Sequence, residues 1–98
     1  SWDDATTMFH EFGHALHGLN SNVVYPSLSG TNTVRDFVEF PSQFHEHFLE
    51  TPEVLKFLTN KEGKQIPKDL LVKIEKAKNA NEGFRSVEFL SSAIVDMK

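Results

Sequence analysis

The chain has 98 residues, of which 39% are hydrophobic and 24% are charged, a composition typical of one small domain or of part of a larger one. Its formal net charge of −4 provides no basic surface, which argues against a nucleic-acid partner. The chain contains no cysteine, so disulfides, thiolate-bound zinc, iron–sulfur clusters and thiol catalysis are excluded.

The first predicted helix covers residues 4–19. Asp3 and Asp4 suit its N-terminal end, as caps or as partners of the helix dipole. Apolar side chains at helical spacing form one stripe, which is typical of the face with which a helix packs. The stripe consists of Met8, Phe12, Ala15, Leu16 and Leu19.

The next segment, residues 19–32, is rich in turn-forming residues and is expected to be irregular, with a short strand over residues 22–25. A second helix is predicted over residues 34–50. Its interior Pro41 leaves two alternatives, because proline removes a backbone donor and kinks a helix. Either the regular helix begins near Val38, so that Pro41 lies in the first turn, or the helix bends; we favour the bend. One side of this helix carries an aromatic stripe that we interpret as packing, made of Phe37, Phe40, Phe44 and Phe48.

Three further helices are predicted towards the C-terminus. The first covers residues 52–58 and the last covers residues 82–97. The middle one starts at Pro67, because proline is favoured as a first helical residue. The connections between the predicted helices are short. The sequence therefore predicts an all-α fold of about five helices.

The informative motif is the segment from His10 through Glu11 to His14. Two histidines four residues apart on a helix differ by about 40° around its axis, so both imidazoles project from one face and can bind one metal ion. Glu11 lies beside them and can deprotonate a metal-bound water without being a ligand. This face points away from the apolar stripe, at about 200–240° if Met8 is set at zero. A non-functional alternative stays open: the motif also arises by chance, and the imidazoles could be surface residues that bind no metal.

A catalytic zinc site usually needs a third protein ligand. The downstream candidates are Asp36, Glu39, His45, Glu46 and His47. We choose Glu39, because a carboxylate among Phe37, Val38 and Phe40 is expected to lie close to a cation. The alternative is that Glu39 occupies an exposed helix position beside an apolar stripe.

Three strings of this sequence resemble the thimet oligopeptidase-like zinc metallopeptidases, and most of all their bacterial peptidyl-dipeptidase and oligopeptidase A branch. The strings are FHEFGHALHG at residues 9–18, LSGTNT at residues 28–33 and RDFVEFPSQ at residues 35–43. Weaker similarity extends through residues 52–54 and 88–90 to residues 96–97, so the resemblance covers essentially the whole chain. The three strings in this order are highly specific.

The resemblance implies roles for four residues. His10, His14 and Glu39 match the three ligands of one zinc ion, and Glu11 matches the general base. The implied reaction is hydrolysis of peptide bonds in short unfolded oligopeptides, which enter a deep channel between two mostly helical halves. The peptidyl-dipeptidase branch releases C-terminal dipeptides, whereas its relatives cut inside oligopeptides.

Other residues receive weaker assignments. Glu46 shares a helix face with Glu39 and could accept a hydrogen bond from a metal-binding imidazole. Asp36 could do the same or could cap the second helix. Gly30 and Thr31 could contact the substrate backbone or form an ordinary turn. His17 is interpreted as a partly exposed polar residue rather than a ligand.

The resemblance also indicates what the chain lacks. The family stabilises the oxyanion with tyrosine and histidine side chains from a downstream loop, and Tyr25, the one tyrosine here, is in the wrong place. The chain starts without Met and ends within a helical pattern. We therefore expect residues 1–98 to be one unit, a partial catalytic domain truncated at both ends. Loss of oxyanion donors typically costs about 100–1000-fold in rate, so the fragment alone is expected to be inactive.

The alternative hypothesis is a non-catalytic helical fragment that self-associates through its unpaired helix faces and lacks metal. The expected partners are short peptides and the remainder of the catalytic domain. No apolar run approaches about 18 residues, so no membrane partner is expected. The absence of cysteine fits the cytoplasm, with the periplasm left open as the alternative.

Overall fold

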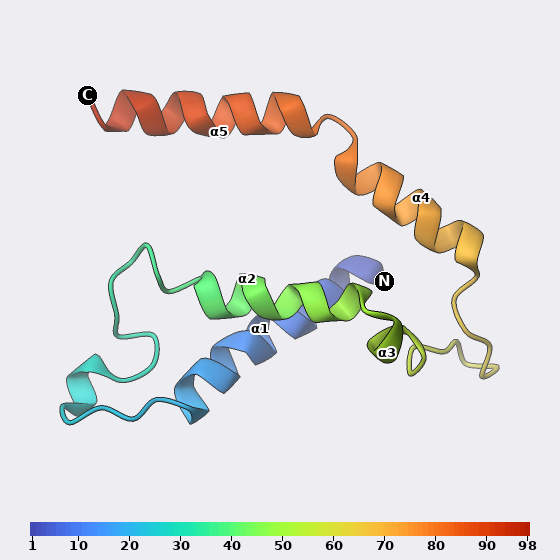
Figure 1. Cartoon of the computed structure of the whole chain (residues 1–98), viewed down its shortest axis with the longest axis horizontal. Coiled ribbons are helices and arrows are strands. Elements are labelled where there is room, and N and C mark those ends of the chain that lie inside the picture. Colours follow the sequence, from blue (N-terminus) through green and yellow to red (C-terminus); the bar gives the residue numbers. More distant parts are fainter. The chain divides into compact units, whose positions relative to one another are not determined.

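The computed structural model describes all residues from 1 to 98 and is all-α, as predicted (Figure 1). The only strand-like feature is an isolated antiparallel bridge between Thr59 and Gln65. We expected a single unit, but the chain divides into two compact units, residues 1–65 and residues 66–98. The first unit contains the α-helices α1 (Trp2–Leu19), α2 (Phe40–Glu46) and α3 (Pro52–Leu55), and the 3-10 helices η1 (Pro26–Leu28) and η2 (His47–Glu50). The second contains α4 (Lys68–Asn79) and α5 (Glu82–Asp96).

Helix α1 begins two residues earlier than predicted, because its cap is Ser1 rather than Asp3 or Asp4. The Ser1 hydroxyl accepts a hydrogen bond from the Asp4 amide, and the Asp4 carboxylate in turn bonds the N-terminal residue. This capping box satisfies amide groups that the first helical turn leaves without partners. The cap therefore uses Asp4 as the third helical residue, not as the cap itself.

The second helix differs from its prediction, since α2 begins at Phe40 and not at residue 34. Pro41 lies in its first turn, where a missing amide donor has no cost, so the bend that we favoured is wrong. Residues 35–39 form turns, with the Phe37 amide bonded to the Val34 carbonyl and the Phe40 amide to the Phe37 carbonyl. The short strand expected at residues 22–25 is also absent.

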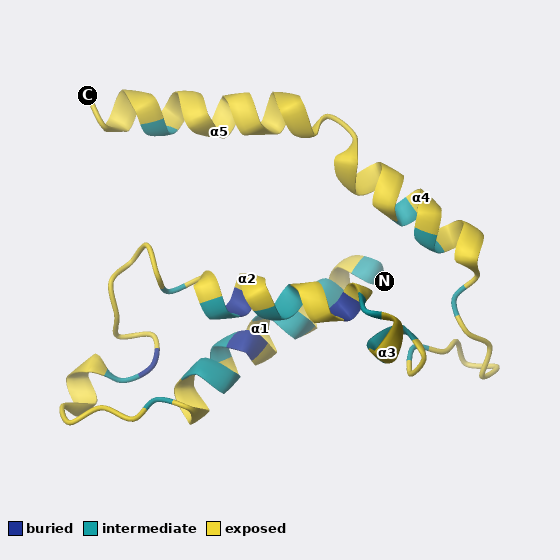
Figure 2. Ribbon diagram, in the orientation of Figure 1, coloured by how far each residue is buried: buried dark blue, intermediate teal, exposed yellow.

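Helices α1 and α2 pack closely where two small residues meet. A Cβ atom placed on Gly13 would lie 2.6 Å from the Cα atom of Ser42, closer than atoms can approach. Gly13 and Ser42 are both buried, and Figure 2 shows dark blue, buried segments on both α1 and α2. Leu49 in η2, only 1% exposed, is the buried apolar residue of this unit. The packing face of α1 is therefore the face that carries Gly13.

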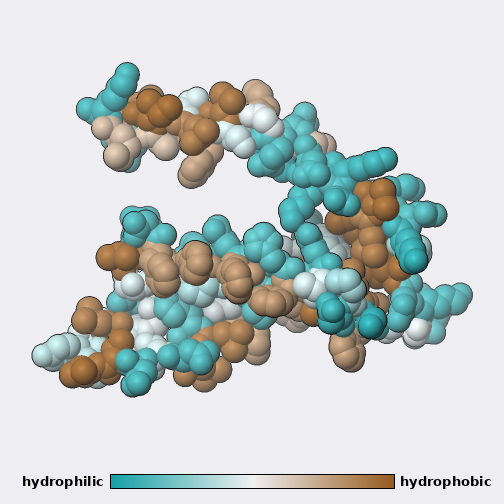
Figure 3. All heavy atoms as spheres, viewed as in Figure 1, coloured by the Kyte–Doolittle hydropathy of each residue, from teal (hydrophilic) through white to brown (hydrophobic).

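The apolar stripes of the first two predicted helices do not form the core. Met8 and Phe12 on α1, and Phe40 and Phe44 on α2, are all exposed, and Figure 3 shows apolar side chains on the surface. The aromatic rings of α2 stack on one another, with centroids 6.3 Å apart for Phe40 and Phe44, but other elements do not cover them. The prediction that these stripes are packed is wrong for this chain, because the α1–α2 contact uses the small-residue faces instead.

The second unit consists of two helices joined by a short turn. Asn81 adopts a left-handed conformation, with φ of 58°, and precedes α5. Neither α4 nor α5 contains a buried residue. None of the helices in the chain combines the length and the apolar character that crossing a bilayer requires.

Candidate metal centre

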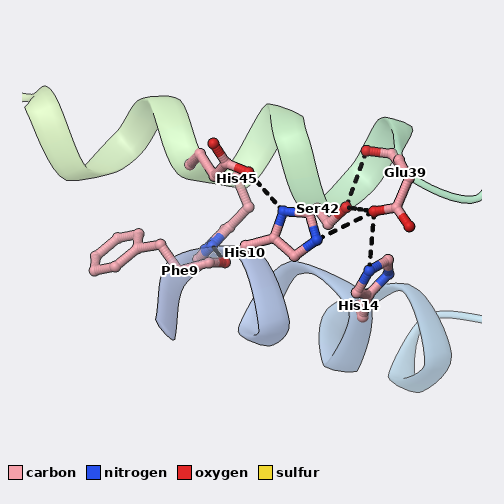
Figure 4. Close-up of polar contacts among 7 residues, drawn as sticks. Phe9, His10, His14, Glu39, Ser42 and His45 are labelled. Carbon is pink, nitrogen blue, oxygen red and sulfur yellow. Dashed lines mark hydrogen bonds and ion pairs between the residues drawn. The ribbon is translucent and has the colours of Figure 1, made fainter. Parts of the chain in front are cut away.

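Three side chains from α1 and from the start of α2 converge on one point (Figure 4). The Nε2 atoms of His10 and His14 each lie 3.1 Å from Oε2 of Glu39. The two imidazole rings are edge to face, with centroids 4.9 Å apart. One ligand atom from each of the three residues can be chosen so that all lie within 4.8 Å of one another. This is the set of three residues that the sequence predicted as metal ligands.

The close helix packing explains how Glu39 reaches the histidines. Glu39 is the residue immediately before α2, and its carbonyl accepts the first helical hydrogen bond from the Gln43 amide, at 2.9 Å. Ser42, one turn later, lies against Gly13, which stands between the two histidines on α1. Because Gly13 has no side chain, α2 approaches α1 closely enough to bring the Glu39 carboxylate to the imidazoles.

Glu46 orients the imidazole of His10. Its Oε1 atom lies 2.5 Å from Nδ1 of His10, and this hydrogen bond is the main reason why the pKa of His10 is raised. An Nδ1–H that donates to a carboxylate leaves Nε2 as the atom available for a metal ion. The structure therefore places Glu46 where we expected a partner of a metal-binding imidazole.

Ser42 supports the Glu39 carboxylate. Its hydroxyl lies 2.9 Å from Oε2 of Glu39, and this hydrogen bond is the main reason why the pKa of that carboxyl is lowered. The imidazoles of His14 and His10 lower the pKa further, whereas desolvation opposes the shift. The direction of this shift favours the ionised form of Glu39, which is the form that binds a metal ion.

The donor set fits a divalent cation of the zinc type. If both imidazoles are neutral and carry their proton on Nδ1, the lone pairs of both Nε2 atoms face the carboxylate oxygen. Three hydrogen-bond acceptors then meet at one point, and they need a proton or a cation between them. Two imidazole nitrogens and one carboxylate oxygen form a ligand set that is typical of catalytic zinc, where a fourth position stays open for water. Cysteine-rich structural sites cannot form here, because the chain has no cysteine.

The remaining predicted site residues lie outside this group. Glu11 is exposed on α1, next to His10. Asp36 is exposed in the turns before α2 and is not among the converging residues. Gly30 is buried with a φ of 55°, and its amide donates to the Ser21 hydroxyl at 2.9 Å. Thr31 is exposed.

Histidines 17, 45 and 47 do not join the metal-binding group either. His17 lies edge to face with Phe37, with centroids 6.0 Å apart, and its Nδ1 is buried without a hydrogen-bond partner. His45 donates from Nδ1 to the Phe9 carbonyl of α1, at 2.7 Å, and its ring stacks on the Phe9 ring. His45 therefore links α2 to the residue of α1 that directly precedes His10.

Sequence reasoning assigned no role to Gly13 or Ser42, and it considered His45 only as a possible third ligand, which it is not. Gly13 stands inside the motif, and a glycine in the middle of a helix signals close packing. Ser42 follows Glu39 by three residues, a spacing that permits local side-chain hydrogen bonds. His45 carried no such signal, because its partner is a backbone carbonyl on another helix.

Comparison with known proteins gives a consistent result. The model of peptidase family M3 matches residues 1–98, the whole chain. The chain is 48% identical to dipeptidyl carboxypeptidases from Salmonella typhimurium and Escherichia coli over 99% of its length. It is 37% identical to a thimet-like oligopeptidase from Dictyostelium discoideum over 96% of its length. These alignments cover only 14–15% of the relatives' own lengths.

Proposed function

Because the chain belongs to peptidase family M3, we propose that it is the zinc-binding part of a metallopeptidase that hydrolyses short oligopeptides. The observation that carries this proposal is the convergence of His10 and His14 on one carboxylate oxygen of Glu39. One zinc ion would be held by the Nε2 atoms of the two histidines and by Glu39.

Bound zinc supplies Lewis-acid activation of water and of the scissile carbonyl. Glu11, exposed beside His10 on α1, accepts the proton of the attacking water at its carboxylate and returns it to the leaving amine. Glu46 keeps the proton of His10 on Nδ1, so that Nε2 stays free for the metal. Ser42 donates a hydrogen bond to the carboxylate of Glu39.

The names of the relatives support a proposal for the substrate class. The two relatives with 48% identity carry the name dipeptidyl carboxypeptidase, whereas the thimet-like oligopeptidase is 37% identical. We therefore propose release of C-terminal dipeptides rather than internal cleavage. The oxyanion donors and most of the substrate channel would come from residues outside this chain, so residues 1–98 alone are proposed to be inactive.

A second candidate function concerns residues 1–98 alone. Phe40 and Phe44 of α2 are 60% and 57% exposed, and contiguous exposed aromatic side chains commonly mediate association. Self-association of a non-catalytic fragment would cover this stripe. Light scattering at increasing concentration tests it: a mass that stays at the monomer value excludes this second function.

Zinc titration by calorimetry tests the ligand assignment. We expect one zinc per wild-type chain, and substantially weaker binding by Glu39→Ala. Glu75→Ala, which removes an exposed carboxylate from α4, is the matched control and should bind as the wild type does. Equal weak binding by the wild type and Glu39→Ala would contradict the proposal.

Peptidase activity tests the general base separately. In the complete protein that contains this chain, Glu11→Gln should lower kcat by about 100–10,000-fold, the usual contribution of a general acid–base group. Zinc content should stay at one per chain, since Glu11 is not a ligand. Near-normal activity of this variant would show that another group accepts the proton.

A further inference from the structure

Ser42 is the one polar residue of the chain that is fully buried, with 0% exposure. Its hydroxyl lies 2.9 Å from Oε2 of Glu39 and 2.9 Å from the backbone carbonyl oxygen of the same residue. Both of these partners belong to Glu39, so the buried hydroxyl is satisfied only by that residue. A buried hydroxyl without a partner would be costly, which ties the position of Ser42 to that of Glu39.

The hydroxyl has one proton to donate, and the carboxylate is its stronger acceptor. The Glu39 carbonyl already accepts a hydrogen bond from the Gln43 amide. The Ser42 proton is therefore free for Oε2, the same oxygen that faces His10 and His14. Figure 4 shows these contacts meeting at one carboxylate oxygen.

The backbone of Ser42 cannot shift easily. A Cβ atom on Gly13 would be 2.6 Å from the Cα atom of Ser42, so the backbones of α1 and α2 touch at this point. Gly13 lies between His10 and His14 in the sequence. The hydroxyl of Ser42 is consequently held at a defined place relative to the two imidazoles.

Glu39, in contrast, is free to move on its solvent side. Its side chain is 51% exposed, and glutamate has several rotatable bonds whose freedom must be lost when it binds a metal ion. A hydrogen bond from a buried, fixed donor selects the binding rotamer in advance. Such preorganisation strengthens binding without any added ligand.

We propose that Ser42 is a positioning residue, whose hydroxyl holds Oε2 of Glu39 towards His10 and His14 before the metal ion arrives. This inference rests on the proposed function, because it assumes that Glu39 is a metal ligand. It adds a residue that does not touch the metal ion but sets the geometry of one that does.

The test is the zinc affinity of Ser42→Ala, measured in the complete protein by competition with a chelator. We expect affinity to fall by about 10–100-fold, the usual effect of losing a partner of a metal ligand. Thr51→Val is the matched control. The Thr51 hydroxyl also donates to a carbonyl three residues earlier, that of Phe48, but is not among the residues that contact the candidate ligands. This control should bind zinc as the wild type does.

A double-mutant cycle separates positioning from a general structural effect. In a Glu39→Ala background, Ser42→Ala should leave zinc affinity unchanged within about twofold, because no carboxylate remains to be positioned. An equal loss of affinity in both backgrounds would show that Ser42 acts through the fold, and would overturn the inference.

The remaining outcomes are also informative. If Glu39→Ala binds zinc as the wild type does, the proposed function fails; if Glu39→Ala weakens binding but Ser42→Ala does not, only the role of Ser42 fails. Circular dichroism checks that the variants are folded. Should Ser42→Ala lose helical structure, Ser42→Cys repeats the test, because a thiol is a much weaker hydrogen-bond donor than the hydroxyl that it replaces; unfolding of both variants would assign the hydroxyl to folding instead of positioning.

Discussion

The two units of the chain contain helices of similar amphipathic character but use them differently. In the first unit, α1 and α2 are in close contact at Gly13 and Ser42, and Leu49 of η2 is buried. In the second unit, α4 and α5 bury no residue, and Leu90 and Ile94 of α5 remain exposed. An apolar stripe at helical spacing is common to both units.

This difference shows that an apolar stripe does not by itself decide where a helix packs. The distance between packed helices depends on the side chains at the contact, and two backbones can touch only where small residues face each other. In this chain that condition is met on the face of α1 that carries the histidines, and the apolar stripe of α1 is left exposed. The packing that builds the candidate metal centre is therefore also the packing that stabilises the first unit.

The largest expected effect comes from the buried leucine. Leu49→Ala should lower the free energy of unfolding of the first unit by about 2–5 kcal/mol, because it leaves a cavity at a buried site. Leu90→Ala is the matched control: its side chain is exposed on α5, so the change should stay within about 0.5 kcal/mol. Urea denaturation followed by circular dichroism measures both. Equal losses would mean that the two units are packed alike.

A methyl group on Gly13 tests the helix contact directly. Gly13→Ala should destabilise the first unit by about 1–3 kcal/mol through overpacking, and should weaken zinc binding as α2 moves away from α1. Gly83→Ala provides the contrast, since no atom lies within 4 Å of a Cβ at that position of α5. That variant should be slightly more stable, by up to about 1 kcal/mol, because alanine is the better helix former. Thermal unfolding would contradict the comparison if both variants changed in the same direction.

Replacing Glu46 tests the hydrogen bond that links the metal centre to α2. Glu46→Gln should weaken zinc binding by about 10–100-fold, because His10 loses the carboxylate that fixes its Nδ1 proton. Glu75→Gln on α4 is the matched control and should leave affinity unchanged. Competition with a chelator gives both values. A wild-type affinity for Glu46→Gln would show that the backbone alone orients His10.

The smallest expected effect is the pH dependence of the metal-free chain. The raised pKa of His10 stabilises the fold below the ordinary histidine pKa of 6.5, and this contribution is lost as the pH rises through the raised value. The lowered pKa of Glu39 acts in the opposite sense. Its contribution is present above the ordinary value of 4.5 and is lost as the pH falls through the lowered value.

The measurement compares wild type and His10→Gln after removal of metal by a chelator. Their difference in unfolding free energy should be larger near pH 5.5 than near pH 8.5, about one unit below and two units above the ordinary histidine pKa. His47→Gln, which replaces a histidine outside the metal-binding group, serves as the control. Its difference in unfolding free energy from the wild type is measured at the same two pH values. A difference that grows towards high pH would contradict the direction of the His10 shift.

Parts of the structure could be predicted from local sequence patterns. The spacing of His10 and His14 predicted two imidazoles on one helix face, and Glu39 was chosen as their partner from its apolar neighbours. The helix content was predictable, because each helix has local apolar spacing. The start of α2 was not predictable in this way. The two alternatives for Pro41 differ only in the path of the residues just before it, and tertiary contacts select that path.

Local spacing and residue identity are enough to specify an all-α chain, a pair of imidazoles one turn apart and a family membership that covers all 98 residues. The packing of the helices selects the face of α1 that meets α2, and it brings Ser42 and Glu46 of α2 to the candidate ligands. The physical reason is distance along the chain: local patterns specify a helix, whereas the approach of two helices depends on the fit of side chains far apart in sequence.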